Sequence, residues 1–238
     1  MAAVHGSDAV VIGDEIALTG FLNNTTVTSS VQTVNVTAFG NNSEVFLAGV
    51  GSGSLALAGM FDAAANASDV ELHGALAAAS GKIVTVGYGG LAIGNRVSMI
   101  QGRITSYNVQ SPAADAVRVS ATFDGDGPVS SGVSLHDLVA VSGAGNYASV
   151  DQSSSSAFGG FGQLHVTALT GTNVIVKIQD STDNSTFADF ITFTSATGAT
   201  QQRSATVTGT LNRYVRAIVS GGTFSSATFT CSLARNFR

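Results

Sequence analysis

Apolar and polar residues alternate along most of this chain. In one segment Leu55, Leu57 and Phe61 fall on one face of an extended chain, whereas Ala56 and Ala58 fall on the other. A repeat of two residues is typical of a strand with one face in a hydrophobic core. β-Branched residues, which suit a pleated sheet, are plentiful in such runs. The pattern therefore predicts a mainly β protein. The same alternation recurs in residues 27–38, 117–123, 163–169 and 174–179.

One segment follows a helical period instead. Ser68 and Glu71 have the spacing of a capping box, in which each side chain satisfies a backbone N–H of the first turn. Gly81 follows as a stop signal. The sequence therefore predicts one α-helix, over Ser68–Ala79, and residues 134–139 are compatible with a second, short helical turn. The expected apolar face of the helix carries Leu72, Ala75, Leu76 and Ala79.

A stretch rich in glycine and serine divides the chain by composition. It spans residues 142–160 and includes four consecutive serines, Ser153–Ser156. Such a composition is typical of a connector. A short strand around Tyr147–Asp151 can still lie inside it. We therefore place a domain boundary near residue 142.

Beyond this connector, short strands follow one another without a helix. Turns are expected at residues 180–184 and at Gly221-Gly222, where residues that favour turns gather. Many short strands at regular spacing indicate a small β-sandwich. The predicted organisation is a first domain over residues 1–141 and an all-β sandwich domain over residues 142–238, with the connector at its start.

Charge is scarce in this sequence. Charged residues make up 11% of the chain, against roughly 25% in an average globular domain. Because a soluble monomer needs a charged surface, this composition favours a protein that buries much of its surface against other chains. The alternative is a surface of neutral Ser, Thr, Asn and Gln. The net charge of −5 and the presence of only two lysines, Lys82 and Lys177, argue against tight binding of nucleic acid.

The sequence offers little metal or cofactor chemistry. None of the four histidines lies at metal-ligand spacing from another, and the single cysteine, Cys231, stands alone. Residues 124–127 read Asp-Gly-Asp-Gly, which could hold calcium but lacks the spacing of a calcium loop and is more simply a turn. The prediction is no metal site and no cofactor.

A catalytic site is not predicted either. Ser134, His136 and Asp137 lie close together in the sequence, so a nucleophilic triad can be imagined. No Gly-x-Ser-x-Gly turn frames a serine, however, and these residues are more simply ordinary polar groups near the end of the first domain. We therefore expect a protein that is not an enzyme.

Several short motifs in the first 140 residues carry a family resemblance. The segment Thr37-Ala38-Phe39-Gly40 ends a paired strand, and a loop with Phe46 and Gly49 leads into residues 54–62. The helix at Ser68 and the segment Gly132-Val133-Ser134-Leu135 follow in the same order. This arrangement resembles the tail tube proteins of long-tailed bacteriophages (siphophages). Residues 164–167, 176–181 and 213–217 resemble β-sandwich modules appended to phage tail proteins.

The resemblance implies a specific assembly. The fold would be a tail-tube-like β-sandwich or partial barrel with one α-helix, and the protein would be a virion structural protein. Its subunits would form hexameric rings that stack into a hollow tube, with strands of neighbouring subunits joined edge to edge. Viral double-stranded DNA would pass through without specific binding. The partners would be copies of the chain and other tail proteins, with no membrane.

The resemblance also implies a location and a contact surface. The protein would lie in the virion tail after assembly in the host cytoplasm, which agrees with the lack of a signal-peptide pattern in the first eight residues. The loop from Phe39 to Gly53, led by Phe46, would contact neighbouring subunits. The expected contact residues are Phe39, Gly40, Glu44, Phe46, Gly49, Gly51 and Gly53.

Other functions stay open on the sequence alone. One alternative is a capsid decoration protein or a minor tail protein, and another is a surface- or glycan-binding module in which the C-terminal sandwich is the active part. A hydrolase ranks lowest. For the tube, an acidic lumen that repels DNA phosphate is a further hypothesis, because the chain is acidic overall.

Overall fold

The computed structural model describes residues 5–76, 78 and 81–236. Within these residues the protein is mainly β with one α-helix, as the hydrophobic pattern predicts. The chain divides into two compact units, which are described separately. Unit 1 contains residues 1–20, 83–99 and 130–238, and unit 2 contains residues 21–82 and 100–129.

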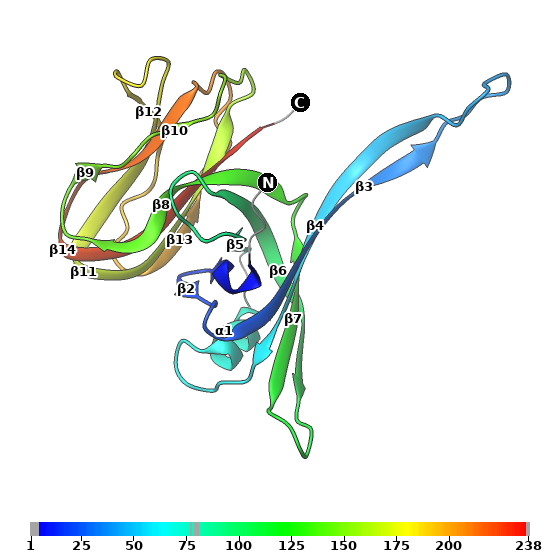
Figure 1. The fold of residues 1–238 in the computed structure, drawn as a ribbon, viewed down its shortest axis with the longest axis horizontal. Coiled ribbons are helices and arrows are strands. Elements are labelled where there is room, and N and C mark those ends of the chain that lie inside the picture. Colours follow the sequence, from blue (N-terminus) through cyan, green and yellow to red (C-terminus); the bar gives the residue numbers. More distant parts are fainter. Residues whose placement is uncertain (1–4, 77, 79–80, 237–238) are drawn as a thin grey trace. The chain divides into compact units, whose positions relative to one another are not determined.

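Unit 1 is an antiparallel β structure (Figure 1). Its strand order is β12-β11-β14-β8-β6-β5-β1-β2, where β6 contributes its first residues; β13 pairs with β11, and β9 and β10 pair with β14. A short 3₁₀ turn, Gly6–Asp8, precedes β1. The strands are β1 (Val10–Gly13), β2 (Ile16–Ala17), β5 (Lys82–Gly87), β6 (Arg96–Gln110), β8 (Ser130–Val141), β9 (Gly145–Asn146), β10 (Val150–Asp151), β11 (Gly160–Ser181), β12 (Ala188–Thr192), β13 (Thr200–Arg203) and β14 (Tyr214–Arg235).

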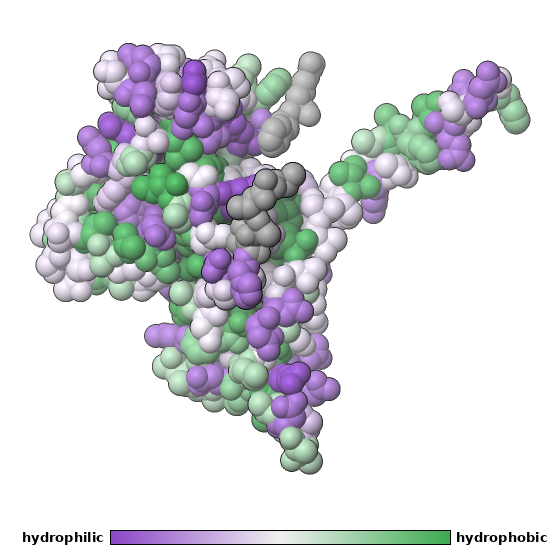
Figure 2. Space-filling model, viewed as in Figure 1, coloured by the Kyte–Doolittle hydropathy of each residue, from purple (hydrophilic) through white to green (hydrophobic). Residues whose placement is uncertain are grey.

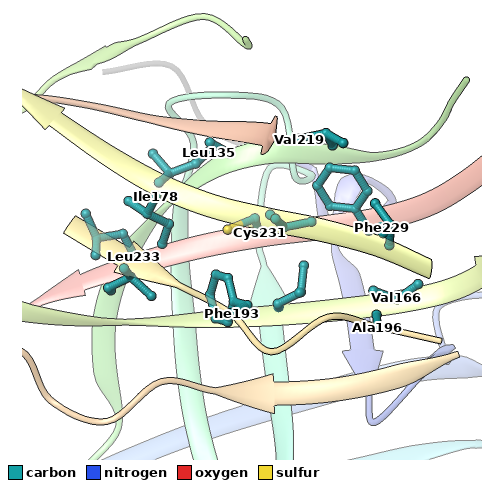
Figure 3. Close-up of a cluster of buried hydrophobic side chains, with 14 of the residues drawn as sticks. Leu135, Val166, Ile178, Phe193, Ala196, Val219, Phe229, Cys231 and Leu233 are labelled. Atoms are coloured by element: carbon teal, nitrogen blue, oxygen red, sulfur yellow. The ribbon is translucent and has the colours of Figure 1, made fainter. Parts of the chain in front are cut away.

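Two long strands, β11 and β14, organise unit 1. They pair along their whole lengths, from Gly160 opposite Arg235 to Ser181 opposite Tyr214. Apolar residues alternate along both strands and meet side chains of β8 and β12 in one core (Figure 3). Burying a Val, Leu, Ile or Phe side chain stabilises a fold by roughly 1.5–3 kcal/mol. Cys231 lies in the same core, and burial raises the pKa of its thiol.

Unit 2 is a sheet of four strands with a helix. Its order is β3-β4-β7-β6, where β6 contributes its second half, so that β3 and β6 are the outer strands. The core-facing side carries Leu55, Leu57 and Phe123. Leu72 on the helix is also buried. The new elements are β3 (Leu22–Asn35), β4 (Phe46–Met60), α1 (Ser68–Leu76) and β7 (Arg118–Gly125).

The helix begins at Ser68, where the sequence predicts, and the Ser68 side chain forms hydrogen bonds outside the helix. The Ser68 hydroxyl donates to the Met60 carbonyl at 2.7 Å and accepts the Asp62 N–H at 3.1 Å, so it joins α1 to the end of β4. Leu72 is buried as expected, whereas Leu76 is exposed. Ala79, the last residue of the expected apolar face, lies outside the described residues.

Two local predictions are wrong. Residues 134–139 belong to β8 rather than to a helical turn, because they pair with β14. The expected turn at Gly221-Gly222 lies inside β14, where Gly222 pairs with Val174 at a φ of 129° that glycine tolerates. Long-range pairing explains both outcomes.

The two units also differ from the expected break near residue 142. The pairing of β8 with β14, for example Val141 opposite Ala227, places residues 130–141 in the same unit as the C-terminal strands. The connector of residues 142–160 contains β9 and β10, which pair with β14.

Candidate assembly surface

A long hairpin is the most exposed element of unit 2. β3 and β4 pair from Leu22 opposite Gly59 out to Asn35 opposite Phe46, and residues 36–45 form the tip. Figure 1 shows the two strands running out together to this tip. All residues from 28 to 50 are exposed. We call residues 31–50 the arm. The expected loop from Phe39 to Gly53 is therefore in part a strand, because residues 46–53 belong to β4.

One face of the arm is aliphatic. Val34 lies opposite Leu47, and the Val36 N–H donates to the Val45 carbonyl one step further out. Residues directly opposite in an antiparallel pair share a face, as do residues two apart. These four side chains therefore form one patch, and their exposures are 58% for Val34, 63% for Leu47, 48% for Val36 and 43% for Val45. We call this patch the apolar arm face; Figure 2 shows hydrophobic residues along the arm.

The other face of the arm is mixed. It carries Asn35 opposite Phe46 and Thr33 opposite Ala48. Glu44 is the only charged residue from Leu22 to Met60. A long hairpin edge with so little charge lacks the usual protection against pairing with other chains. The arm is therefore a surface that favours a protein partner over water.

The tip places three of the expected contact residues at the end of the arm. Phe39 is fully exposed, and Gly40 has a φ of 98°, in the region that favours glycine. Glu44 lies on the return limb of the tip. The Thr37 hydroxyl donates to Asn35 Oδ1 at 2.6 Å and accepts the Val45 N–H at 2.8 Å, which fixes the tip's base. Phe46 itself is half exposed at the start of β4.

The three remaining expected residues have an internal reason to be glycine. A Cβ on Gly53 would lie 2.7 Å from the Val129 nitrogen, and one on Gly51 would lie 3.3 Å from the Pro128 ring. A Cβ on Gly49 would lie 3.2 Å from the carbonyl oxygen of Gln32 on the paired strand. These glycines let β4 approach neighbouring backbone within unit 2. Sequence reasoning missed this role because Pro128 and Val129 are far away in the chain.

The imagined triad does not form a nucleophilic site. The Ser134 hydroxyl donates to the carbonyl of Leu91 at 2.6 Å. The His136 ring is stacked on Phe229 with centroids 4.1 Å apart, and its Nδ1 lies 3.1 Å from the Phe229 carbonyl oxygen. Burial lowers the pKa of His136. Both side chains are therefore committed to the core of unit 1.

A second buried histidine joins distant parts of unit 1. His165 on β11 contacts the Asp14 carbonyl oxygen through Nδ1 at 2.5 Å and the Thr85 hydroxyl through Nε2 at 2.9 Å. Desolvation by burial lowers its pKa to about 4. A carbonyl oxygen can only accept, so the neutral ring carries its proton on Nδ1. The Thr85 hydroxyl lies 2.9 Å from both His165 Nε2 and Gln163 Oε1. Both His165 and Thr85 are buried, so this contact belongs to the interior of unit 1.

Metal-site and membrane-helix features can be assessed only for the part of the chain that the structure describes. Within it, no group of three or more His, Cys, Asp or Glu side chains could hold a metal ion. In the segment of residues 124–127, Asp124 belongs to β7, and its carboxylate accepts a hydrogen bond from the Thr105 hydroxyl at 2.8 Å. No helix in residues 5–76, 78 and 81–236 is long and apolar enough to cross a membrane.

Comparisons with known proteins find likenesses among solved structures. No protein-family model and no curated protein matches the sequence. A chain in the tail of an empty gene transfer agent (GTA) particle with C6 symmetry is 21% identical, with a TM-score of 0.44 over 54% of this chain and 98% of that one. The SPP1 tail tube protein is 12% identical, with a TM-score of 0.45 over 53% of this chain and 78% of that one.

A third likeness covers nearly the whole chain. The SPP1 Dit protein, described as a hub adsorption apparatus, is 12% identical, with a TM-score of 0.40 over 96% of this chain and 99% of that one. At these TM-scores the likenesses carry no functional weight. The functional proposal is therefore built on the chain's own residues.

Proposed function

We propose that this protein is a structural subunit of a phage-type tail, which assembles with its own copies into hexameric rings that stack as a tube. The single observation that carries the proposal is the arm, a long exposed hairpin with an aliphatic face and one charge. An element of this kind is costly in a free monomer, because exposed apolar surface and unpaired strand edges promote association. Identical neighbours would remove both costs.

Lateral contacts would use the outer strands of unit 2. β3 pairs with β4 on one side and is the outer strand of the β3-β4-β7-β6 order. Joining β3 of one copy to β6 of the next would repeat around an axis and close, which is how a heterologous interface forms a ring. Closure leaves no exposed strand edges in the ring.

Axial contacts would use the arm. The four side chains of the apolar arm face are about half exposed, so burying the remainder would contribute about 0.7–1.5 kcal/mol for each side chain. Phe39 at the tip, which is fully exposed, would extend this contact. Because every subunit in a ring presents the same arm, weak individual contacts would add up along the ring.

The test removes the arm while keeping the sheet. Ser30 lies opposite Ser52, so residues 31–51 can be replaced by Asn-Gly, which forms a tight two-residue hairpin turn. We expect the variant to fold and to form no tubes in negative-stain electron microscopy, whereas the intact chain forms them. Circular dichroism of both proteins checks the fold. Tubes of ordinary length from the shortened chain would rule out this role of the arm.

The same images separate the alternatives. A capsid decoration protein or a minor tail protein would form closed small complexes rather than long tubes. The assignment of residues 142–238 to an accessory, outward-facing role stays a prediction. Because β14 pairs with β8, glycan binding is best tested with the full chain rather than with a fragment that starts at residue 142.

A further inference from the structure

Among the described residues of unit 2, one face of the sheet is buried and the other is more exposed. From Gly53 to Gly59 every second residue of β4 is buried, whereas Ala56 and Ala58 point to the other side. β7 alternates in step, with Val119, Ala121 and Phe123 buried and the residues between them more exposed. We call the side opposite these buried residues the bare face.

The strand register aligns the bare face in rows across four strands. One row runs Thr28, Ser54, Asp124 and Arg103. The next rows are Thr26, Ala56, Thr122, Ser106 and Asn24, Ala58, Ser120, Asn108.

Side-chain contacts agree with this register. The Ser30 and Ser52 hydroxyls lie 2.9 Å apart across β3 and β4. The Thr105 hydroxyl donates to the Asp124 carboxylate at 2.8 Å across β6 and β7. The bare face is thus a surface of small hydroxyl, amide and methyl groups.

The charges of the bare face are close to balanced, unlike those of the whole chain. Its strands carry Arg103, Arg118 and Asp124, and Arg118 forms an ion pair with Asp115 at 2.6 Å just beyond the strand. The whole chain has a net charge of −5. The acids of this protein are therefore concentrated elsewhere, and the bare face presents neither the basic patch that binds DNA phosphate nor the acidic one expected for a repelling lumen.

The geometry of a closed ring distinguishes the two faces of the sheet. The covered face carries α1 and the core of unit 2, so a ring closed with that face inward would fill its own passage. In a closed sheet with many strands the lumen-facing side chains line a water-filled channel, which suits the small polar groups of the bare face. The bare face also has few large apolar groups that would need a protein cover.

Resting on the ring proposed above, we propose that the bare face lines the bore, as a nearly neutral, hydroxyl-rich surface for passing double-stranded DNA. Hydroxyl and amide groups hold water at the wall. Two arginines and two aspartates per subunit leave no net charge to hold phosphate. DNA would slide because the wall neither attracts nor repels it strongly.

Cysteine accessibility tests which face is inside. Ser120→Cys places a thiol on the bare face, and Val70→Cys places one on the exposed side of α1; the native Cys231 is buried and gives little background. In assembled tubes we expect Ser120→Cys to react with N-ethylmaleimide but not with a bulky polyethylene-glycol maleimide. Val70→Cys should react with both, and both variants should react with both reagents as monomers.

The other outcomes are equally decisive. If Ser120→Cys in tubes reacts with the bulky reagent, or with neither reagent, the bare face does not line the bore. If Val70→Cys in tubes reacts with N-ethylmaleimide but not with the bulky maleimide, the proposal is overturned as well. Failure of the intact chain to form tubes would instead count against the proposed function itself, so the two failures are distinguishable.

A charge substitution tests the chemistry of the wall. Ser120→Lys adds one cation per subunit to the bare face, and Ser120→Glu is the matched control of opposite sign. With short fluorescent double-stranded DNA, we expect lysine tubes to retain at least tenfold more DNA than native or glutamate tubes, with retention falling as salt rises. Equal retention by native and lysine tubes would contradict a neutral bore.

Discussion

Val34 lies directly opposite Leu47 on the arm, and both side chains are more than half exposed. A cross-strand aliphatic pair normally stabilises a sheet from inside a core. Here the pair faces outward on a hairpin, so its burial depends on another molecule.

Charge on the apolar arm face should therefore block assembly. We expect Leu47→Asp to reduce tube formation at least tenfold, because a carboxylate would have to be buried in the contact. The matched control is Thr33→Asp, which adds the same charge on the opposite face of the arm. Sedimentation of assembled material, followed by electron microscopy, measures both. Equal loss in the two variants would show that the contact has no preference for the aliphatic face.

Gly53 should be sensitive to the smallest substitution. In Gly53→Ala the new methyl group meets the Val129 nitrogen and the Gly127 carbonyl oxygen, at 2.7 and 2.9 Å. Backbone atoms must shift to make room, so we expect the free energy of unfolding to fall by about 1–3 kcal/mol.

The control for this substitution is Gly74→Ala on α1, where a Cβ meets nothing within 4 Å. In a helix this change should stabilise the protein by up to about 1 kcal/mol. Urea unfolding of the arm-shortened monomer provides both values. An unchanged midpoint for Gly53→Ala would mean that residues 127–129 do not hold β4 closely.

Stability should fall on acidification because of His165. Its pKa is about 4 in the folded protein and about 6.5 in an unfolded chain. Above pH of about 6.5 the ring is neutral in both states and the full stability is present. As the pH falls from about 6.5 to about 4, the unfolded chain gains a proton that the folded protein does not, and stability is lost.

The size of this loss is about 3 kcal/mol across the window, since each pKa unit corresponds to about 1.4 kcal/mol. Urea unfolding at several pH values measures it. His165→Gln should flatten the dependence, although His136, whose pKa burial also lowers, leaves part of it. His5→Gln, at an exposed position, is the control. A pH profile unchanged by His165→Gln would contradict the assignment.

The elements that the sequence predicts well are those whose pattern is local. Leu55 and Leu57 alternate with alanines, and this alone places them on the buried side of a strand. Ser68 and Leu72 identify the helix for the same reason. These signals depend on neighbours within a few residues.

The arm was harder to predict because its residues carry conflicting local signals. Glycine and serine from Gly49 to Ser54 are typical of a loop, yet this segment is a strand. The register also shifts between Val31 and Thr33, where β4 carries one extra residue. This moves Leu47 out of step with Leu55 and Leu57 and hides the aliphatic face from a simple count of alternate residues. Only the pairing with β3 shows that Val34 and Leu47 meet.

The organisation into units was harder still, because it depends on pairs that are distant in sequence. Composition indicates a connector at residues 142–160, but β14 pairs with β8 across that connector. No local pattern near Ser130 or Ala227 contains this information.

The place of β14 in the chain has a consequence for the order of events during synthesis. β14 follows every other strand of unit 1, and it pairs with β8, β9, β10 and β11. Contacts between distant segments form slowly, because the intervening chain must first be ordered. Unit 1 therefore cannot complete its sheet while β14 is still inside the ribosome, even when unit 2 and its arm have already left the ribosome. A nascent chain would expose the apolar arm face before unit 1 has folded. A chaperone that binds apolar surface would help most during this interval.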